Sequence, residues 1–123
     1  MPWEFDNDKP IYTQLVNIFK LKIISATLKP AEKLSSVREL AQIAGVNPNT
    51  MQRALSELEH EKLVYSNRTA GRFVTEDENL IANIRETYAK NYITELVSSL
   101  LKIGLSTEEI LALIEQELKK TSR

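Results

Sequence analysis

The 123-residue sequence has no cysteine, a single histidine and only three glycines. Without cysteine the chain can form neither a disulfide nor a thiolate metal site, and one histidine cannot supply a His cluster for a metal ion. The sequence also lacks a Gly-rich phosphate loop, and its acidic residues are scattered along polar helix faces. These absences make an enzyme the least favoured class, and we predict no catalytic residue, no metal and no cofactor.

Long apolar runs are missing as well. No run approaches the roughly 20 residues of a membrane-spanning helix, and residues 1–9 lack the basic-then-apolar layout of a signal peptide. We therefore predict no membrane association. The absence of cysteine fits a reducing compartment, and we expect a cytoplasmic protein with one core, or one core plus an appendage.

The net charge of −1 does not by itself favour a nucleic-acid partner. Residues 1–75 carry ten Lys or Arg against eight Asp or Glu, whereas residues 76–123 carry six against nine. The basic excess is modest and N-terminal, so it supports DNA binding only weakly.

Residues 36–61 read as two helices around a tight turn, the pattern of a helix-turn-helix. Ser36 followed by Glu39 is a capping box, in which each side chain bonds the other residue's backbone N–H and so starts a helix. Gly45 ends this first helix. Its apolar positions recur at helical spacing and are Val37, Leu40, Ala41 and Ala44.

The second helix is predicted to begin at Pro48, where the missing N–H costs nothing, with Asn47 as its cap. One face is apolar and consists of Met51, Ala54, Leu55 and Leu58. The remaining surface is rich in hydrogen-bonding groups without being acidic, and carries Asn49, Thr50, Gln52, Arg53 and Ser56. Amides pair with adenine edges and guanidinium with guanine, so this face suits the major groove of DNA. The alternative is an ordinary solvated helix face.

The segments before this pair of helices complete a three-helix unit. Trp3 and Phe5 alternate with other residues, which predicts an extended segment that anchors the N-terminus by packing. A helix is predicted from Pro10 to near Ala26, and a connector then leads to Leu34, which packs at the start of the next helix. The apolar positions of the predicted helix are Ile11, Leu15, Ile18, Phe19 and Ile23. Each helix has one apolar face, so the three must pack on one another.

After Leu63 the pattern changes to a β-hairpin. Strands are predicted over residues 64–66 and 72–75, with a turn between them in which Gly71 marks the bend. A helix-turn-helix followed by such a ribbon is the winged form. Arg68 and Arg72 would flank the tip of the wing and reach phosphate or the minor groove. The alternative is a structural hairpin with incidental arginines.

Residues 76–79 form an acidic boundary and the first turn of another helix, because carboxylates favour the positive end of the helix dipole. This long helix is predicted to run to about Ile103, where Gly104 closes it. Ser106 with Glu109 is a second capping box, which predicts a final helix. That helix is expected to end among cations that suit a helix C-terminus, namely Lys119, Lys120 and Arg123.

The last two helices carry more apolar surface than they can cover themselves. Burying one Leu or Ile is worth about 1.5–3 kcal/mol, so an exposed stripe of several would be costly. A second copy of the chain is the simplest cover, and folding back onto the N-terminal part is the alternative. The predicted dimerisation residues are Ile84, Tyr88, Tyr92, Leu96, Leu100, Ile110 and Ile114.

The predicted fold class is mainly α with a small β-hairpin. A winged helix-turn-helix DNA-binding domain is expected over residues 1–75, and a C-terminal two-helix dimerisation unit over residues 76–123. The expected partners are double-stranded DNA and a second copy of the chain. The residues identify no small-molecule effector, and the rival function is a winged-helix module that binds proteins without binding DNA.

Four motifs run in order across residues 10–74. They are PIYTQL at 10–15, LSSVRELA at 34–41, VNPNT followed by RAL and LE over 46–59, and GRFV at 71–74. With these motifs the chain resembles a GntR-type transcriptional regulator, and its short two-helix tail resembles the YtrA subfamily. The resemblance implies a winged helix-turn-helix dimer on a two-fold operator, commonly repressing an operon for a transporter.

The resemblance also implies residue roles. The family arginine that grips the operator falls on Arg38, for which a surface ion pair with Glu39 is the alternative, and contacts from the recognition helix fall on Asn47, Asn49, Thr50 and Gln52. With the arginines noted above, the predicted DNA-binding residues are Arg38, Asn47, Asn49, Thr50, Gln52, Arg53, Arg68, Gly71 and Arg72.

The chain departs from the family pattern in three places. The Pro-Gly-Asp/Glu connector is Pro30-Ala31-Glu32 here, and Lys62 stands where a glycine usually ends the recognition helix. A left-handed conformation at Lys62 would be strained by about 1 kcal/mol. At the wing, Thr69 and Ala70 replace a glycine and a basic residue, and Arg72 replaces a small residue.

Overall fold

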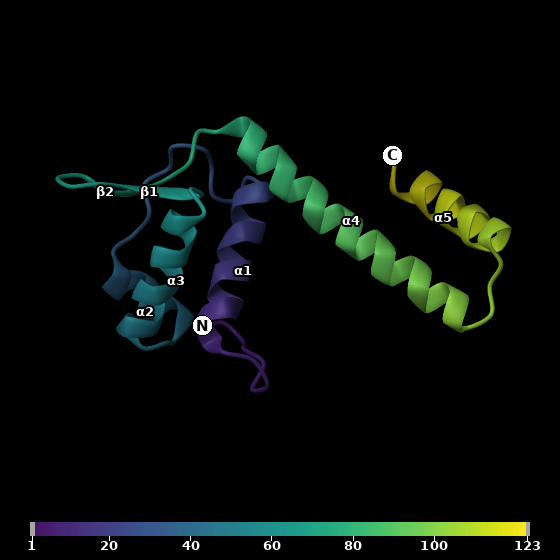
Figure 1. Ribbon diagram of the computed structural model, residues 1–123, viewed down its shortest axis with the longest axis horizontal. Helices are drawn as coiled ribbons and strands as arrows, with labels where there is room; N and C mark the ends of the chain where they lie inside the picture. The colour runs from purple at the N-terminus through teal and green to yellow at the C-terminus, as the bar shows by residue number, and fades with distance from the viewer. Residues whose placement is uncertain (1, 123) are drawn as a thin grey trace. The chain divides into compact units, whose positions relative to one another are not determined.

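The computed structural model describes residues 2–122. Within this range the elements are α1 (Ile11–Ile24), α2 (Val37–Ala44), α3 (Pro48–His60), β1 (Val64–Asn67), β2 (Gly71–Val74), α4 (Glu78–Lys102) and α5 (Thr107–Thr121), as labelled in Figure 1. The internal contacts divide the chain into two compact units, with the boundary between Ile84 and Arg85. The predicted class, mainly α with a small β-hairpin, is confirmed.

Helix α3 is the centre of the first unit, because α1, α2 and β1 all contact it (Figure 1). None of its four predicted core side chains has any exposed surface; these are Met51, Ala54, Leu55 and Leu58. From α1, Leu15, Phe19 and Ile23 are buried in the same core. Each such side chain stabilises the fold by about 1.5–3 kcal/mol on burial, so the three helices fold as one unit.

The predicted starts of α2 and α3 are confirmed, whereas α1 begins at Ile11, one residue after the predicted Pro10. The Ser36 hydroxyl accepts the Glu39 backbone N–H at 3.1 Å, and the Glu39 carboxylate accepts the Ser36 backbone N–H at 3.1 Å. The Asn47 side chain accepts the Asn49 backbone N–H at 2.7 Å, and Pro48 is the first residue of α3. These bonds set where α2 and α3 begin and therefore which face each helix turns inward.

The N-terminal segment is anchored by packing, as predicted. The Trp3 backbone N–H donates to the Ala44 carbonyl at 3.1 Å, and the Trp3 ring packs edge-on against Phe19 with centroids 5.8 Å apart. At the turn between α2 and α3, Gly45 has a φ of 75°, and an added Cβ would lie 2.7 Å from Cβ of Pro2. The close approach of this segment therefore needs glycine at position 45.

Strands β1 and β2 form the predicted antiparallel hairpin, with Ser66 opposite Arg72 in the register. The connector gives β2 a second neighbour, which the sequence pattern did not predict. The Leu34 backbone N–H donates to the Arg72 carbonyl at 2.9 Å, and the Val74 backbone N–H donates to the Glu32 carbonyl at 2.9 Å. The base of the wing is thus held on both sides.

Among residues 2–122, three residues other than glycine adopt the left-handed conformation: Ala26, Ala31 and Lys62, with φ of 61°, 66° and 66°. At Ala26 this conformation follows the end of α1 at Ile24, two residues earlier than predicted. Lys62, which stands where the family usually has glycine, therefore does adopt the left-handed conformation. The fold of the first unit therefore carries backbone strain at each of these turns.

The second unit contains most of α4, from Arg85 onward, and all of α5. Gly104, with a φ of 96°, follows α4, and Ser106 with Glu109 forms the predicted capping box at α5. Lys119 and Lys120 lie in the last turn of α5, as predicted. Arg123, the third cation expected there, lies outside the described residues.

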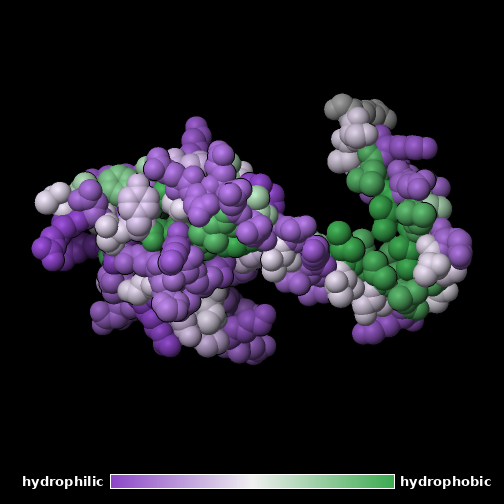
Figure 2. All heavy atoms as spheres, turned by 45° about the horizontal axis from the view of Figure 1, so that its top comes forward, coloured by the Kyte–Doolittle hydropathy of each residue, from purple (hydrophilic) through white to green (hydrophobic). Residues whose placement is uncertain are grey.

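Apolar side chains of the second unit are mostly exposed. Ile110 is the one buried apolar residue in the described range 85–122. Figure 2 shows hydrophobic residues gathered over this unit. The large exposed ones are Tyr92, Ile93, Leu96, Leu101, Ile103, Leu111, Leu113 and Leu118, with exposed fractions from 45% to 71%. No helix in the described part of the chain combines the length and apolar character needed to cross a membrane.

Lys62→Gly is expected to stabilise the protein. The left-handed conformation costs a residue with a Cβ about 1–2 kcal/mol, and glycine avoids this cost but loses more entropy on folding. We expect the free energy of unfolding, measured by chemical denaturation, to rise by about 0.5–1 kcal/mol. Lys62→Ala, which removes the same side chain but keeps Cβ, should give no such gain. An equal gain in both variants would assign the effect to the lysine side chain and not to the backbone.

Candidate nucleic-acid interface

The outer face of α3 is polar and open. Because the core fixes the inner face, Asn49, Gln52 and Arg53 project outward and are exposed, and Thr50 is half-buried. Asn47, just before the helix, is also exposed, but its Oδ1 accepts the Asn49 backbone N–H. The amide N–H groups of Asn47 are left for another acceptor.

Two columns of side chains run along this face. Gln52 donates from Nε2 to the hydroxyl of Ser56 at 3.2 Å, one turn further along the helix. Asn49 and Arg53 are likewise four residues apart and therefore neighbours on the helix surface. The guanidinium of Arg53 lies over the ring of Tyr12 from α1, with Cζ 3.6 Å from the ring centroid. The predicted readout residues of α3 thus lie on one surface.

Arg38 is exposed on the first turn of α2. The alternative role of Arg38 was a surface ion pair with Glu39. Within residues 2–122 no ion pair involves Arg38, so the structure does not support this alternative. The Glu39 carboxylate is instead used by the capping box. The backbone N–H of Ser36, and then its hydroxyl, lower the pKa of Glu39 from its ordinary value. The Arg38 guanidinium is available for an external anion.

The two wing arginines differ in their surroundings. Arg68 is exposed in the turn between the strands. Arg72 donates from Nε to the Glu59 carboxylate of α3, and the same oxygen accepts the Ser66 hydroxyl at 2.6 Å. Burial would raise the pKa of Glu59, but the hydrogen bonds from Ser66 and Arg72, with the Arg72 charge, hold it below its ordinary value. Arg72 therefore links the wing to α3.

Sequence reasoning missed Glu59 as a member of this surface. The one available clue was the pairing of Ser66 with Arg72 across the hairpin. Two side chains that lie opposite each other on one face of a hairpin can bind the same third residue. Locating that partner on α3 requires the packing of the hairpin against the helix, which the sequence pattern does not supply.

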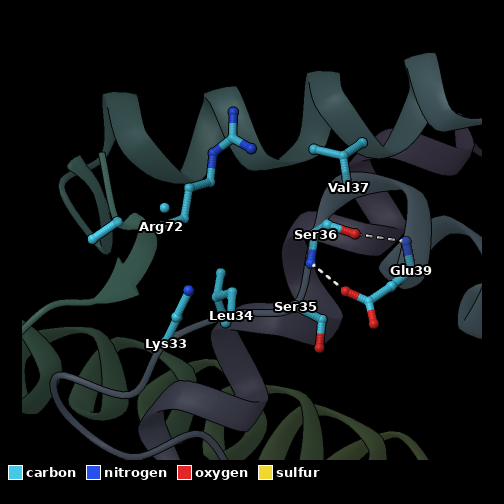
Figure 3. A pocket seen from close by; sticks show the side chains of 9 residues that line it. Lys33, Leu34, Ser35, Ser36, Val37, Glu39 and Arg72 are labelled. Atoms are coloured by element: carbon cyan, nitrogen blue, oxygen red, sulfur yellow. Dashed lines mark hydrogen bonds between the residues drawn. The ribbon is translucent and has the colours of Figure 1, made fainter. Parts of the chain in front are cut away.

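A polar cleft of about 620 Å³ lies between the start of α2 and the wing. Figure 3 shows Lys33 and Arg72 on one side of it and the Ser36–Glu39 capping box on the other. Gly71, with a φ of 109°, lines the cleft from the first position of β2. The predicted residues of α2, α3 and the wing all belong to the first unit. No group of three or more potential metal ligands occurs among the described residues.

The predicted dimerisation residues lie mostly beyond the unit boundary. Ile84 belongs to the first unit, and the other six belong to the second. Tyr92 and Leu96 are exposed, whereas Ile110 is buried. Tyr88, Leu100 and Ile114 are half-buried. An apolar groove of about 610 Å³ on α4 is lined by residues that include Ile93, Val97 and Leu101.

Comparisons with known proteins agree with this architecture. Residues 11–74 match the family described as "Bacterial regulatory proteins, gntR family". The chain is 32% identical over 102 residues to the HTH-type transcriptional repressor YtrA of Bacillus subtilis (strain 168), covering 82% of this chain and 78% of YtrA. A solved GntR family transcriptional regulator from Listeria monocytogenes is 38% identical with a TM-score of 0.81, covering 91% of this chain and 98% of that chain.

A shorter similarity concerns a protein solved with DNA. The structure titled AraR(DBD) in complex with operator ORX1 is 27% identical with a TM-score of 0.55. The match covers 61% of this chain and 99% of that chain.

Glu59→Gln is expected to remove a pH-dependent part of the stability. Since the pKa of Glu59 is lowered in the folded state, its contribution is fully present above the ordinary value of 4.5 and is lost as the pH falls through the folded-state pKa. Urea denaturation should show wild type more stable than Glu59→Gln at pH 7, with the difference shrinking below about pH 4.5. Glu57→Gln, two residues earlier on α3, is the control. A difference between wild type and Glu59→Gln that is the same at pH 3 and pH 7 would contradict the role of the charged carboxylate.

Proposed function

The chain belongs to the GntR family of bacterial regulatory proteins, and from this premise we propose that it is a repressor that binds a two-fold operator as a homodimer. The chain is a DNA-binding transcriptional regulator.

The observation that carries the proposal is the outer face of α3. Asn49, Gln52 and Arg53 are exposed on a helix whose start is fixed and whose inner face is fully buried. Amide groups on a rigid helix can pair with base edges in the major groove, and a guanidinium beside them can contact a base edge or a backbone phosphate. The exposed Arg38 of α2 supports a contact to the same duplex, as does the wing through Arg68. We propose that Arg72 serves the wing chiefly by holding it on α3.

The homodimer is supported by the exposed apolar surface of the second unit. Monomeric proteins rarely expose this much contiguous apolar surface, and a symmetric partner covers it by presenting the same patch. The groove beside Ile93 and Leu101 offers a place for apolar side chains of the partner's tail. A two-fold dimer would set two α3 helices about 34–36 Å apart, the repeat of one turn of B-DNA.

Repression is proposed because YtrA, a relative over most of the chain, carries that role in its name. We propose an operon for a transporter as the regulated target and the cytoplasm as the site of action, where bacterial operators lie. A small-molecule effector, if one acts, would use the helical tail or its dimer contact.

Binding to DNA is tested by selecting fragments from random DNA with the wild-type chain and titrating the recovered duplex against salt. The proposal predicts an inverted repeat, with an affinity that falls by roughly 0.9 decades per decade of salt for each phosphate contact. Failure to enrich any sequence, together with binding that is insensitive to salt, would favour a winged-helix module that contacts proteins instead.

Arg38→Ala is expected to weaken binding to the recovered duplex by about tenfold, the size of a lost bidentate arginine contact. The thermal unfolding midpoint should be unchanged, because Arg38 is exposed and has no ion-pair partner among residues 2–122. Lys119→Ala, which removes the same charge from α5, is the control and should bind as wild type. Unchanged affinity in Arg38→Ala would remove this residue from the interface.

Sedimentation is expected to show a dimer at micromolar concentration. Leu96 is 45% exposed, and Leu96→Glu should weaken the dimer by about tenfold or more, because a charge replaces a buried apolar contact in each subunit. Asn91→Glu places the same charge on the polar side of α4 and should leave the dimer intact. A well-folded wild-type monomer at micromolar concentration would contradict this account of the tail.

A further inference from the structure

Arg53 is the one arginine of α3, and an aromatic ring orders its side chain. The guanidinium carbon lies 3.6 Å from the centroid of the Tyr12 ring, a distance at which the planar cation stacks on the ring face. Tyr12 is half-buried in the first turn of α1, so the ring itself is held by the fold. Tyr12 of α1 and Arg53 of α3 are 41 residues apart in the sequence, and their side chains are in contact.

The stack leaves the edge of the guanidinium open. An arginine carries five N–H donors around its rim, and a contact to its face uses none of them. Among residues 2–122, no carboxylate pairs with Arg53 and no acceptor takes its N–H groups. Arg72 in the same unit is different, because the Glu59 carboxylate takes its Nε. The protein therefore fixes the orientation of the Arg53 guanidinium but provides no acceptor for its N–H groups.

The position of Arg53 decides which acceptor suits this edge. It lies one turn beyond Asn49 on α3, on the flank that borders α1. When a helix occupies the major groove, its outermost face points to the bases and its flanks approach the sugar-phosphate strands on either side. A guanidinium on a flank, with a free and fixed edge, matches the two oxygens of one phosphate.

We propose that Tyr12 is a positioning residue that holds the Arg53 guanidinium edge-outward for a backbone phosphate of the operator. This inference rests on the proposed DNA binding and adds a residue outside the predicted set of contacts. Its physical basis is preorganisation. An arginine side chain without a stacking partner loses rotamer freedom when it binds phosphate. An arginine side chain already stacked on Tyr12 loses less, so the protein binds DNA more tightly than it would without the stack.

The test is a double-mutant cycle on the duplex recovered by selection, with fluorescence anisotropy at several salt concentrations. The proteins are wild type, Tyr12→Phe, Tyr12→Leu, Arg53→Ala and the double variant Tyr12→Leu/Arg53→Ala. Tyr12→Phe keeps the ring and removes only the hydroxyl, whereas Tyr12→Leu keeps apolar bulk and removes the aromatic face. Thermal unfolding of each variant is measured alongside.

The proposal predicts a different result for each change. Arg53→Ala reduces the steepness of the salt dependence by about 0.9, the value of one phosphate contact. Tyr12→Leu weakens binding by about two- to fivefold, the size of an exposed cation–π contact, and leaves the salt steepness nearly unchanged. Tyr12→Phe binds as wild type. In the Arg53→Ala background, Tyr12→Leu has no further effect.

Two outcomes would overturn the proposal. If Tyr12→Leu costs as much affinity in the Arg53→Ala background as in wild type, Tyr12 acts through the fold or through its own contact and not through Arg53. If Tyr12→Phe loses as much as Tyr12→Leu, the hydroxyl and not the ring face is responsible. Both are distinct from failure of the proposed function, in which wild type itself would show no salt-dependent binding.

Discussion

Burial of one face of α3 is the constraint on which the rest of the first unit depends. Met51, Leu55 and Leu58 have no exposed surface, so the helix cannot rotate about its axis without exposing them. Asn47 and Pro48 fix where the helix begins and hence which residues fall on each side. The outward direction of Asn49, Gln52 and Arg53 is therefore a consequence of the core. The same packing holds rigidly the helix that is proposed to contact DNA.

Local signals were sufficient to predict most of the fold. Both capping boxes and the Asn47–Pro48 start depend on residues close in sequence, and the structure has each of them. The hairpin was also predicted locally, but its turn lies at residues 68–70, and Gly71 is the first residue of β2. Contacts between distant segments could not be predicted in this way. The pairing of the connector with β2 and the Glu59–Arg72 bond arise only when the hairpin is placed on α3.

The same distinction applies to the candidate site. The exposed face of α3 followed from its helical period, because inner and outer positions alternate at fixed spacing. The contacts of each arginine could not be predicted from the sequence. Arg38 is unpaired within the described chain, Arg53 is stacked on Tyr12, and Arg72 is bound by the Glu59 carboxylate. Neighbouring elements, and not the residue type, decide which edge of each guanidinium is open.

Methylation protection on the selected duplex tests the central claim, that the outer face of α3 reads the major groove, most directly. Dimethyl sulfate methylates guanine N7 in the major groove and adenine N3 in the minor groove, so it reports which groove the protein occupies. The account predicts protection of guanine N7 in two segments one helical turn apart, about 10 base pairs, or a multiple of it. Protection of adenine N3 alone, with every guanine N7 fully reactive, would contradict it.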